Sequence, residues 1–180
     1  MVTRYVALLR GINVGGRNKV LMSDLRAAFE SAGFESVSTY IQSGNVLLTT
    51  DVAQDGLESE IEVMLELRFG LPLVVVVRSH EQIRAVVQDA PDGFGTEPDT
   101  YYSDTIFLKA PLMTEQVMDV VRLRDGVDAV WAGDGVVYFR RLGARRTESR
   151  MSAIVGRPEY KQMTIRSWST TTRLLALLDA

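Results

Sequence analysis

Residues 37–49, VSTYIQSGNVLLT, decide how the first half of the chain folds. Val37, Thr39 and Ile41 alternate with polar neighbours, and Val46–Thr49 is a second short run beyond Gln42–Asn45. Alternation with a period of two indicates a half-buried strand, and a polar link that contains Gly and Asn is typical of a hairpin turn. We therefore predict two antiparallel strands joined at Gln42–Asn45.

The segments on either side of this hairpin each predict one helix and one strand. Upstream, Tyr5–Leu9 is an apolar strand, and a helix with Ser23 as its N-cap ends at Gly33. Downstream, a helix that begins with a capping box at Asp55 leads to Leu73–Val77, a strand whose lack of polar residues indicates cover on both faces. The resulting order βαββαβ is that of a ferredoxin-like fold, with two helices on one face and the last strand at a sheet edge.

The second half predicts a smaller α+β portion of similar order. A helix from Ser79, a strand near 105–108, a helix from Thr114, a hairpin over 129–140, a helix near 148–154 in the basic segment and a last helix follow one another. Pro91–Asp99 has the composition of a linker or mobile loop. Because an apolar edge strand invites pairing with other chains, we expect the second portion to pack against Leu73–Val77. The fold class is α+β, with domains at 1–78 and 79–180 or one continuous domain.

Composition excludes several classes of protein and site. The 180 residues are 46% apolar and 24% charged, which is typical of a globular chain. With no cysteine and one histidine, His80, the sequence offers no disulfide, no thiolate nucleophile and no His or Cys metal cluster, so we predict no metal. Neither a leader peptide nor a membrane-length apolar run is visible, which indicates a cytoplasmic protein with no membrane partner.

Positive charge gathers in two stretches although the net charge is −3. Residues 1–26 carry a net charge of +4 and residues 140–173 carry +7, which leaves an acidic middle. Two basic stretches separated in this way could form one anion site where they meet in space.

The glycine-rich loop Arg10–Lys19 follows a strand and precedes a helix, where α/β proteins often bind phosphate. Gly11 and Gly16 have P-loop spacing, but Arg17 and Asn18 stand where Lys and Ser or Thr are needed. The predicted N-cap Ser23 also lies too late for the helix dipole to reach the loop. A mobile turn and a ligand-binding loop both remain open.

Two further segments carry polar groups. Gln42–Asn45 is first of all a turn, and its alternative role is a platform of amides and a hydroxyl for a ligand. Residues 149–168 combine arginines with hydroxyls, which suits phosphate or carboxylate, while Trp168 is expected to anchor the last helix in the core. The predicted strand at 45–49 has no aromatic residue, so we reject an RNA-recognition motif.

Three segments together resemble a known family. Residues 5–16, YVALLRGINVGG, residues 39–45, TYIQSGN, and residues 163–166, MTIR, with Trp168, closely resemble signatures of the bacterial family called domain of unknown function 1697. The resemblance implies a two-part α+β protein with a ferredoxin-like portion and no established activity, substrate or cofactor. That family often has Arg-Asn-Trp-Asn near its C-terminus, whereas Ser167 and Ser169 flank Trp168 in this chain.

The function therefore stays unknown at this point, and our leading hypothesis is binding or processing of a small anionic ligand that resembles a phosphate or a nucleotide. The basic site would lie between the glycine-rich loop and the C-terminal basic segment. The candidate ligand-binding residues are Arg10, Gly11, Asn13, Gly15, Gly16, Lys19, Gln42, Ser43, Asn45, Arg150, Lys161, Thr164 and Arg166. The alternative is a nucleic-acid or protein interaction module without catalysis, in which nucleic acid is not favoured. The sequence locates no catalytic residue or cofactor and leaves open whether the chain is an enzyme and whether it forms oligomers.

Overall fold

The computed structural model describes residues 2–180, and contacts divide the chain into two compact units. The first unit comprises the chain up to Ile83 together with Leu174–Ala180, and the second is Arg84–Arg173. Each contains a four-stranded antiparallel sheet, so the predicted α+β fold in two portions is confirmed. The exact domain limits 1–78 and 79–180 stay a prediction. Among the helices of residues 2–180, none is both long enough and apolar enough to span a bilayer.

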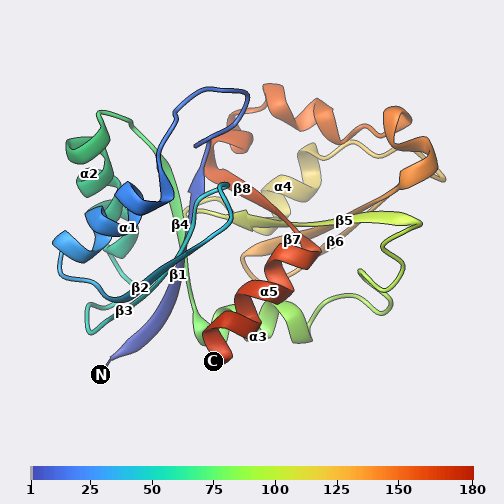
Figure 1. Ribbon diagram of the computed structural model, residues 1–180. Coiled ribbons are helices and arrows are strands. Elements are labelled where there is room, and N and C mark those ends of the chain that lie inside the picture. Colours follow the sequence, from blue (N-terminus) through green and yellow to red (C-terminus); the bar gives the residue numbers. More distant parts are fainter. Residues whose placement is uncertain (1) are drawn as a thin grey trace. The chain divides into compact units, whose positions relative to one another are not determined.

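The first unit has the predicted βαββαβ order. Its elements are β1 (Thr3–Arg10), α1 (Met22–Ser31), β2 (Glu35–Tyr40), β3 (Asn45–Thr50), α2 (Leu57–Phe69) and β4 (Val74–Ser79). The strands lie in the order β2-β3-β1-β4, all neighbours antiparallel, with α1 and α2 on one face of the sheet (Figure 1). The predicted hairpin and the position of β4 at a sheet edge are both confirmed.

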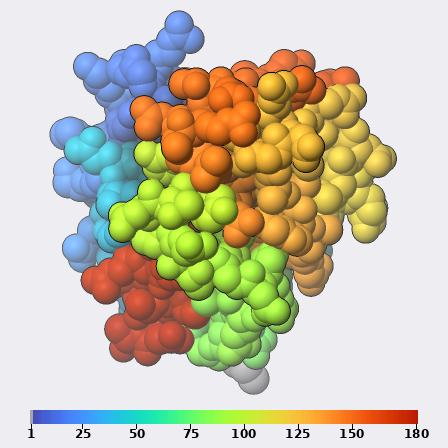
Figure 2. All heavy atoms as spheres, turned by 90° about the vertical axis from the view of Figure 1, so that its right-hand side faces the viewer, coloured from blue at the N-terminus to red at the C-terminus, as the bar shows by residue number. Residues whose placement is uncertain are grey.

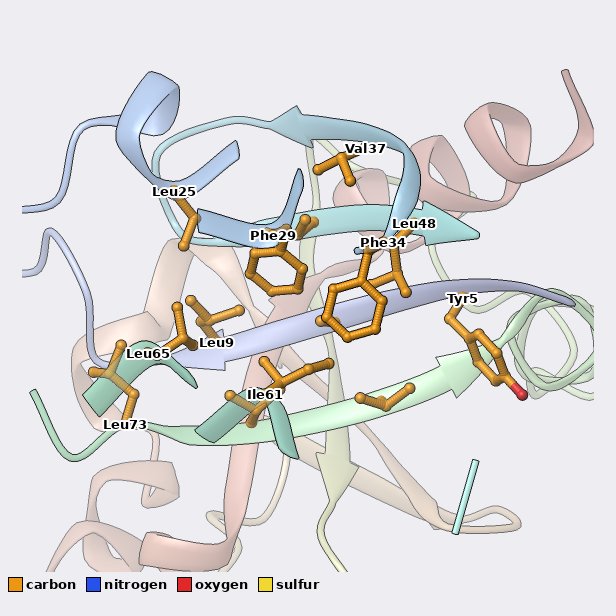
Figure 3. Close-up of a cluster of buried hydrophobic side chains, with 14 of the residues drawn as sticks. Tyr5, Leu9, Leu25, Phe29, Phe34, Val37, Leu48, Ile61, Leu65 and Leu73 are labelled. Carbon is orange, nitrogen blue, oxygen red and sulfur yellow. The ribbon is translucent and has the colours of Figure 1, made fainter. Parts of the chain in front are cut away.

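The core of the first unit fills the space between α1, α2 and the sheet (Figure 3). Phe29 of α1 lies against Phe34, with ring centroids 5.6 Å apart, and Ile61 and Leu65 of α2 are fully buried beside them. Val75–Val77 of β4 are also fully buried, as expected of a strand covered on both faces. These contacts follow the apolar stripes of the two helices, because burial of one helical face is what stabilises such a layer.

Both predicted helix caps in this unit are wrong. Helix α1 begins at Met22 with Leu21 as its N-cap, since the Leu21 carbonyl accepts from the N–H of Leu25 at 2.9 Å. Helix α2 has Gly56 as its N-cap, in the left-handed conformation and without a side-chain cap. The acidic residue Glu58, predicted to complete a capping box, has another role at the sheet edge.

Carboxylates of α2 cover the outer edge of β4. The N–H groups of Val75 and Val77 donate to Glu62 Oε1 and Glu58 Oε1, each at 2.8 Å. Gln54 Nε2 donates to the Val77 carbonyl at 3.2 Å. Backbone groups that would otherwise accept a strand from another chain are thus bonded within the first unit itself.

We expect the double variant Glu58→Ala, Glu62→Ala to lose about 2 kcal/mol of unfolding free energy, because two backbone N–H groups lose charged acceptors. The exposed edge should also raise self-association above that of the wild type, as measured by sedimentation velocity. The matched control Glu58→Gln, Glu62→Gln keeps an oxygen acceptor at each position and should lose less. An alanine variant as stable and as weakly associated as the wild type would contradict this role.

The second unit repeats the strand order of the first with different connections. It contains β5 (Tyr101–Leu108), α4 (Thr114–Val120), β6 (Asp128–Ala132), β7 (Val136–Leu142) and β8 (Met163–Ser167), in the order β6-β7-β5-β8. Three 3₁₀ segments, Gly143–Glu148, Met151–Gly156 and Pro158–Gln162, replace the single helix predicted near residues 148–154. The helices α3 (His80–Gln88) and α5 (Trp168–Asp179) contain the points where the chain passes between units.

The loop over residues 91–99 is anchored in the second unit. Phe94 is buried and meets the rings of Trp131, Tyr138 and Trp168 edge-on, with centroids 6.0, 5.3 and 5.1 Å away. The loop is therefore fixed by an aromatic side chain, which corrects its interpretation as a linker or mobile loop. Trp168 at the start of α5 is part of this aromatic cluster, as predicted for a core anchor.

Candidate functional site

The connection between β1 and α1 is longer than its topology requires. Eleven residues, 11–21, join the first strand to the first helix of the first unit. In the second unit the corresponding connection from β5 to α4 takes five residues, 109–113. The shorter link joins the corresponding strand and helix, so the first connection is six residues longer than this step requires (11 against 5). Positive φ values at Gly15 and Gly16, 58° and 76°, give this loop its turns.

Asn13 holds the loop in shape. Its Nδ2 donates to the carbonyls of Val20 and Gln42 at 3.0 Å each, and its Oδ1 accepts from the Val20 N–H at 2.9 Å. Asn18 adds a bond from Nδ2 to the Gly11 carbonyl at 2.9 Å. The loop is therefore tied to itself and to the β2–β3 turn, and the donors of the Asn13 amide are both committed to backbone.

The β2–β3 turn is tied down in the same way. Asn45 is fully buried, and its Nδ2 donates to the Tyr40 carbonyl at 2.9 Å and to Ser43 Oγ at 3.0 Å. Gly44 has a φ of 84° and lies so close to Ile12 that a Cβ would come within 2.7 Å of Ile12 Cδ1. These bonds support the interpretation of Gln42–Asn45 as a turn first of all, with Gln42 as its exposed member.

A pocket of about 310 Å³ opens where this loop, the turn and the start of α1 meet. The residues that line it are Asn13, Gly16, Lys19, Val20, Leu21, Met22 and Gln42. Lys19 is exposed, and among residues 2–180 no ion pair involves its ammonium group. Leu21 keeps 68% of its surface exposed, so the pocket combines the cation of Lys19 with apolar surface.

The N-terminus of α1 lies in this same pocket. Leu21, its N-cap, makes no side-chain cap, and Leu21 and Met22 line the pocket together with Gly16 and Lys19. The first N–H groups of a helix have no partner within it, and the dipole places partial positive charge there. The helix starts at Met22, one residue before the predicted N-cap Ser23, so its first residues line the same pocket as Gly16 and Lys19 of the loop. Asp24 in the first turn offsets part of this positive potential.

The other candidates divide between the units. Arg10 ends β1 and is half-buried, while Gly11 and Gly15 are exposed in the loop and Ser43 is in the turn. Arg150, Lys161, Thr164 and Arg166 all belong to the second unit. Convergence of the two basic segments on one site stays a prediction.

Arg166 is the most buried of the predicted cations. It pairs with Thr105 across β5 and β8, is 6% exposed, and its Nη1 donates to Thr164 Oγ1 at 2.8 Å and to the Ile165 carbonyl at 3.0 Å. Burial lowers the pKa of the Arg166 guanidinium to about 10, so the group is still cationic at neutral pH. Thr164 therefore serves as a hydrogen-bond partner of Arg166 within β8.

Sequence reasoning missed three apolar members of the pocket, Val20, Leu21 and Met22. The signal that could have found them is an apolar run placed directly between a glycine-rich loop and a helix. Assignment of the N-cap to Ser23 hid it, since it placed these residues outside the helix. Within residues 2–180, no three His, Asp or Glu side chains gather as a metal site would need.

Comparisons with known proteins give a family but no activity. The family described as "Protein of unknown function (DUF1697)" matches residues 2–138. Among solved structures, the conserved bacterial protein SP0830 from Streptococcus pneumoniae is similar, with a TM-score of 0.84 and 27% sequence identity over 99% of each chain. No curated protein matches the sequence.

Proposed function

Since the chain belongs to the family of proteins of unknown function DUF1697, we propose from its own geometry that the first unit binds a small anionic ligand of phosphate or nucleotide type. The ligand occupies the pocket between the glycine-rich loop, the start of α1 and Gln42. One observation carries the proposal: a loop six residues longer than its counterpart in the second unit places Lys19, which is in no ion pair within residues 2–180, beside a helix start without a side-chain cap.

The pocket walls indicate the class of ligand. Lys19 and the first N–H groups of α1 supply positive potential for an anionic group, and backbone N–H groups near Gly16 can add hydrogen bonds. Val20, Leu21 and Met22 supply apolar surface that a bare inorganic ion would leave uncovered. A phosphate joined to a flat or apolar group, as in a nucleotide, uses both kinds of surface.

The residues that line this pocket favour binding over catalysis. They include no carboxylate, histidine or hydroxyl side chain that could act as a base or nucleophile at neutral pH. The side-chain amide of Asn13 is already bonded to the carbonyls of Val20 and Gln42. Processing of the ligand at this pocket would need groups from outside its lining.

We expect Lys19→Gln to weaken AMP binding about tenfold, because the variant removes one charge-assisted contact worth about 1.4 kcal/mol. Isothermal titration calorimetry at low ionic strength measures the change, with adenosine and inorganic phosphate as the two partial ligands. AMP should bind more tightly than either.

Arg26→Gln is the matched control. This variant loses the same charge as Lys19→Gln. Arg26 lies in α1, where its Nε is paired with Glu30 Oε1 at 2.7 Å on the exposed side of the helix. If both variants weaken AMP binding equally, the loss comes from the change in net charge, and the role of Lys19 is overturned. Failure of the wild type to bind AMP and phosphate at all would overturn the proposed function.

Two finer assignments are part of the same proposal. The first unit is a ferredoxin-like domain, supported by its βαββαβ order, its strand order β2-β3-β1-β4 and two helices on one face. The protein acts in the cytoplasm, supported by a sequence that has no cysteine for disulfides. The fractionation of an epitope-tagged chain tests the second assignment.

A further inference from the structure

We propose that the second unit carries a separate site for a sugar phosphate, in a pocket between residues 123–125, which lead into β6, and the 3₁₀ segment that follows β7. The pocket has a volume of about 340 Å³ and is lined by Leu123, Arg124, Asp125, Arg145 and Arg150. In Figure 2, the gold and orange spheres of these two regions adjoin on the face turned to the viewer. This proposal goes beyond the function of the first unit, since it shares no residue with that pocket.

Asp128 brings two of the arginines together. Its Oδ2 accepts from the backbone N–H of Arg124 at 2.8 Å and from that of Arg150 at 2.9 Å. One carboxylate oxygen at the start of β6 therefore fixes two main-chain segments that are far apart in sequence. The third arginine, Arg145, belongs to the 3₁₀ segment Gly143–Glu148. Its guanidinium lies close to Gly126, since Nη1 is 3.8 Å from the position that a Cβ on Gly126 would take.

Of the three carboxylates beside these arginines, Asp125, Asp128 and Glu148, it is Glu148 that forms ion pairs with the guanidinium groups. Glu148 accepts from Arg145 at 2.9 Å (Nε to Oε1) and 2.6 Å (Nη2 to Oε2), and its Oε2 is 4.0 Å from Arg124 Nε. That hydrogen bond from Arg145 lowers the pKa of the Glu148 carboxyl, which keeps it ionised. In the described part of the chain, no ion pair involves the Arg150 guanidinium. Glu148 thus engages the guanidinium groups of Arg124 and Arg145, while that of Arg150 is in no ion pair within residues 2–180.

The donor set indicates a phosphate that carries hydroxyl groups. Guanidinium groups bind phosphate through paired N–H donors, and within residues 2–180 the guanidinium of Arg150 donates no hydrogen bond. Asp125 is an exposed carboxylate in the same lining, and it can accept hydroxyl groups but repels a bare anion. A sugar phosphate satisfies both, since its phosphate faces the arginines and its hydroxyls face Asp125.

Titration of the ¹⁵N-labelled chain with ribose 5-phosphate tests the proposal, with inorganic phosphate and ribose as separate arms. We expect saturable shifts of the amides of Arg124, Asp125, Arg145 and Arg150, and Arg150→Gln should weaken binding at least about tenfold. Arg150→Gln should keep the fold, because the hydrogen bond from residue 150 to Asp128 is donated by its backbone N–H. Asp125→Ala should reduce the preference for ribose 5-phosphate over inorganic phosphate.

Two control variants make the outcome specific. Arg157→Gln removes the same charge from the same basic stretch, but Arg157 is paired with Glu159 at 3.5 Å and lies outside the pocket. Lys19→Gln alters only the pocket of the first unit, so it should leave these shifts unchanged and separates this site from the proposed function. Absent shifts around Arg124 and Arg150, or equal weakening by Arg157→Gln, would overturn the proposal. Equal affinity for ribose 5-phosphate and inorganic phosphate would overturn the role of Asp125.

Discussion

Gly44→Ala is expected to lower the free energy of unfolding by about 3 kcal/mol, through steric overlap added to backbone strain. The new Cβ would lie 2.7 Å from Ile12 Cδ1, 2.9 Å from Ile12 Cγ1 and 2.9 Å from Leu9 Cβ. Leu9 belongs to β1, and its backbone N–H donates to the Gly44 carbonyl at 2.8 Å. This bond holds Gly44 and Leu9 together, so they cannot move apart to make room for the new Cβ. Urea unfolding followed by far-ultraviolet circular dichroism measures the loss.

Gly33→Ala separates the two contributions. Gly33 also has a positive φ, 92°, but a Cβ there would meet nothing within 4 Å. This control should therefore cost only the strain of the left-handed conformation, about 1 kcal/mol. If Gly44→Ala costs no more than Gly33→Ala, the close packing of the turn on the glycine-rich loop is not what fixes this part of the site.

Phe94→Ala should cost about 4 kcal/mol, because it removes a buried ring from the centre of an aromatic cluster. Phe94 is 5% exposed and makes edge contacts with Trp131, Tyr138 and Trp168. The two tryptophans of the chain both belong to this cluster, so near-ultraviolet circular dichroism should lose intensity in the variant.

Phe94→Leu is the conservative variant in this experiment. It keeps most of the apolar surface and loses the edge-on ring contacts, so about 1 kcal/mol is the expected cost. An alanine variant that unfolds within about 0.5 kcal/mol of the wild type, a range usual for surface substitutions, would show that residues 91–99 are a mobile loop after all.

The strand order of the first unit could be predicted because local pattern and tertiary burial agree there. Val37 and Thr39, the Gly44 turn and the apolar run at 73–77 each specify one element. Ile41, predicted to continue the alternation, instead lies outside β2 with a φ of 50° and is 48% exposed. The start of α1 could not be predicted from residue type, since Ser23 has the chemistry of a cap while the carbonyl of Leu21 accepts the first helical hydrogen bond. The 3₁₀ segments after β7 have no apolar period that separates them from an α-helix.

The candidate site was predicted only in its polar part. Gly16, Lys19 and Gln42 do line the pocket of the first unit, together with Asn13. Residue type could not show that the amide of Asn13 is committed to the backbone, because that depends on which carbonyls the folded loop brings within reach. For the same reason Asn45 looked like a ligand group in the sequence, although it is fully buried beneath its own turn.

Amide shifts of the ¹⁵N-labelled chain on addition of AMP test the central claim most directly, since they report where the ligand binds. Saturable shifts should be largest for Gly16, Lys19, Val20 and Met22, and Lys19→Gln should need about tenfold more AMP to reach them. Shifts confined to other residues, or identical titrations of the wild type and Lys19→Gln, would contradict a ligand pocket beside the start of α1.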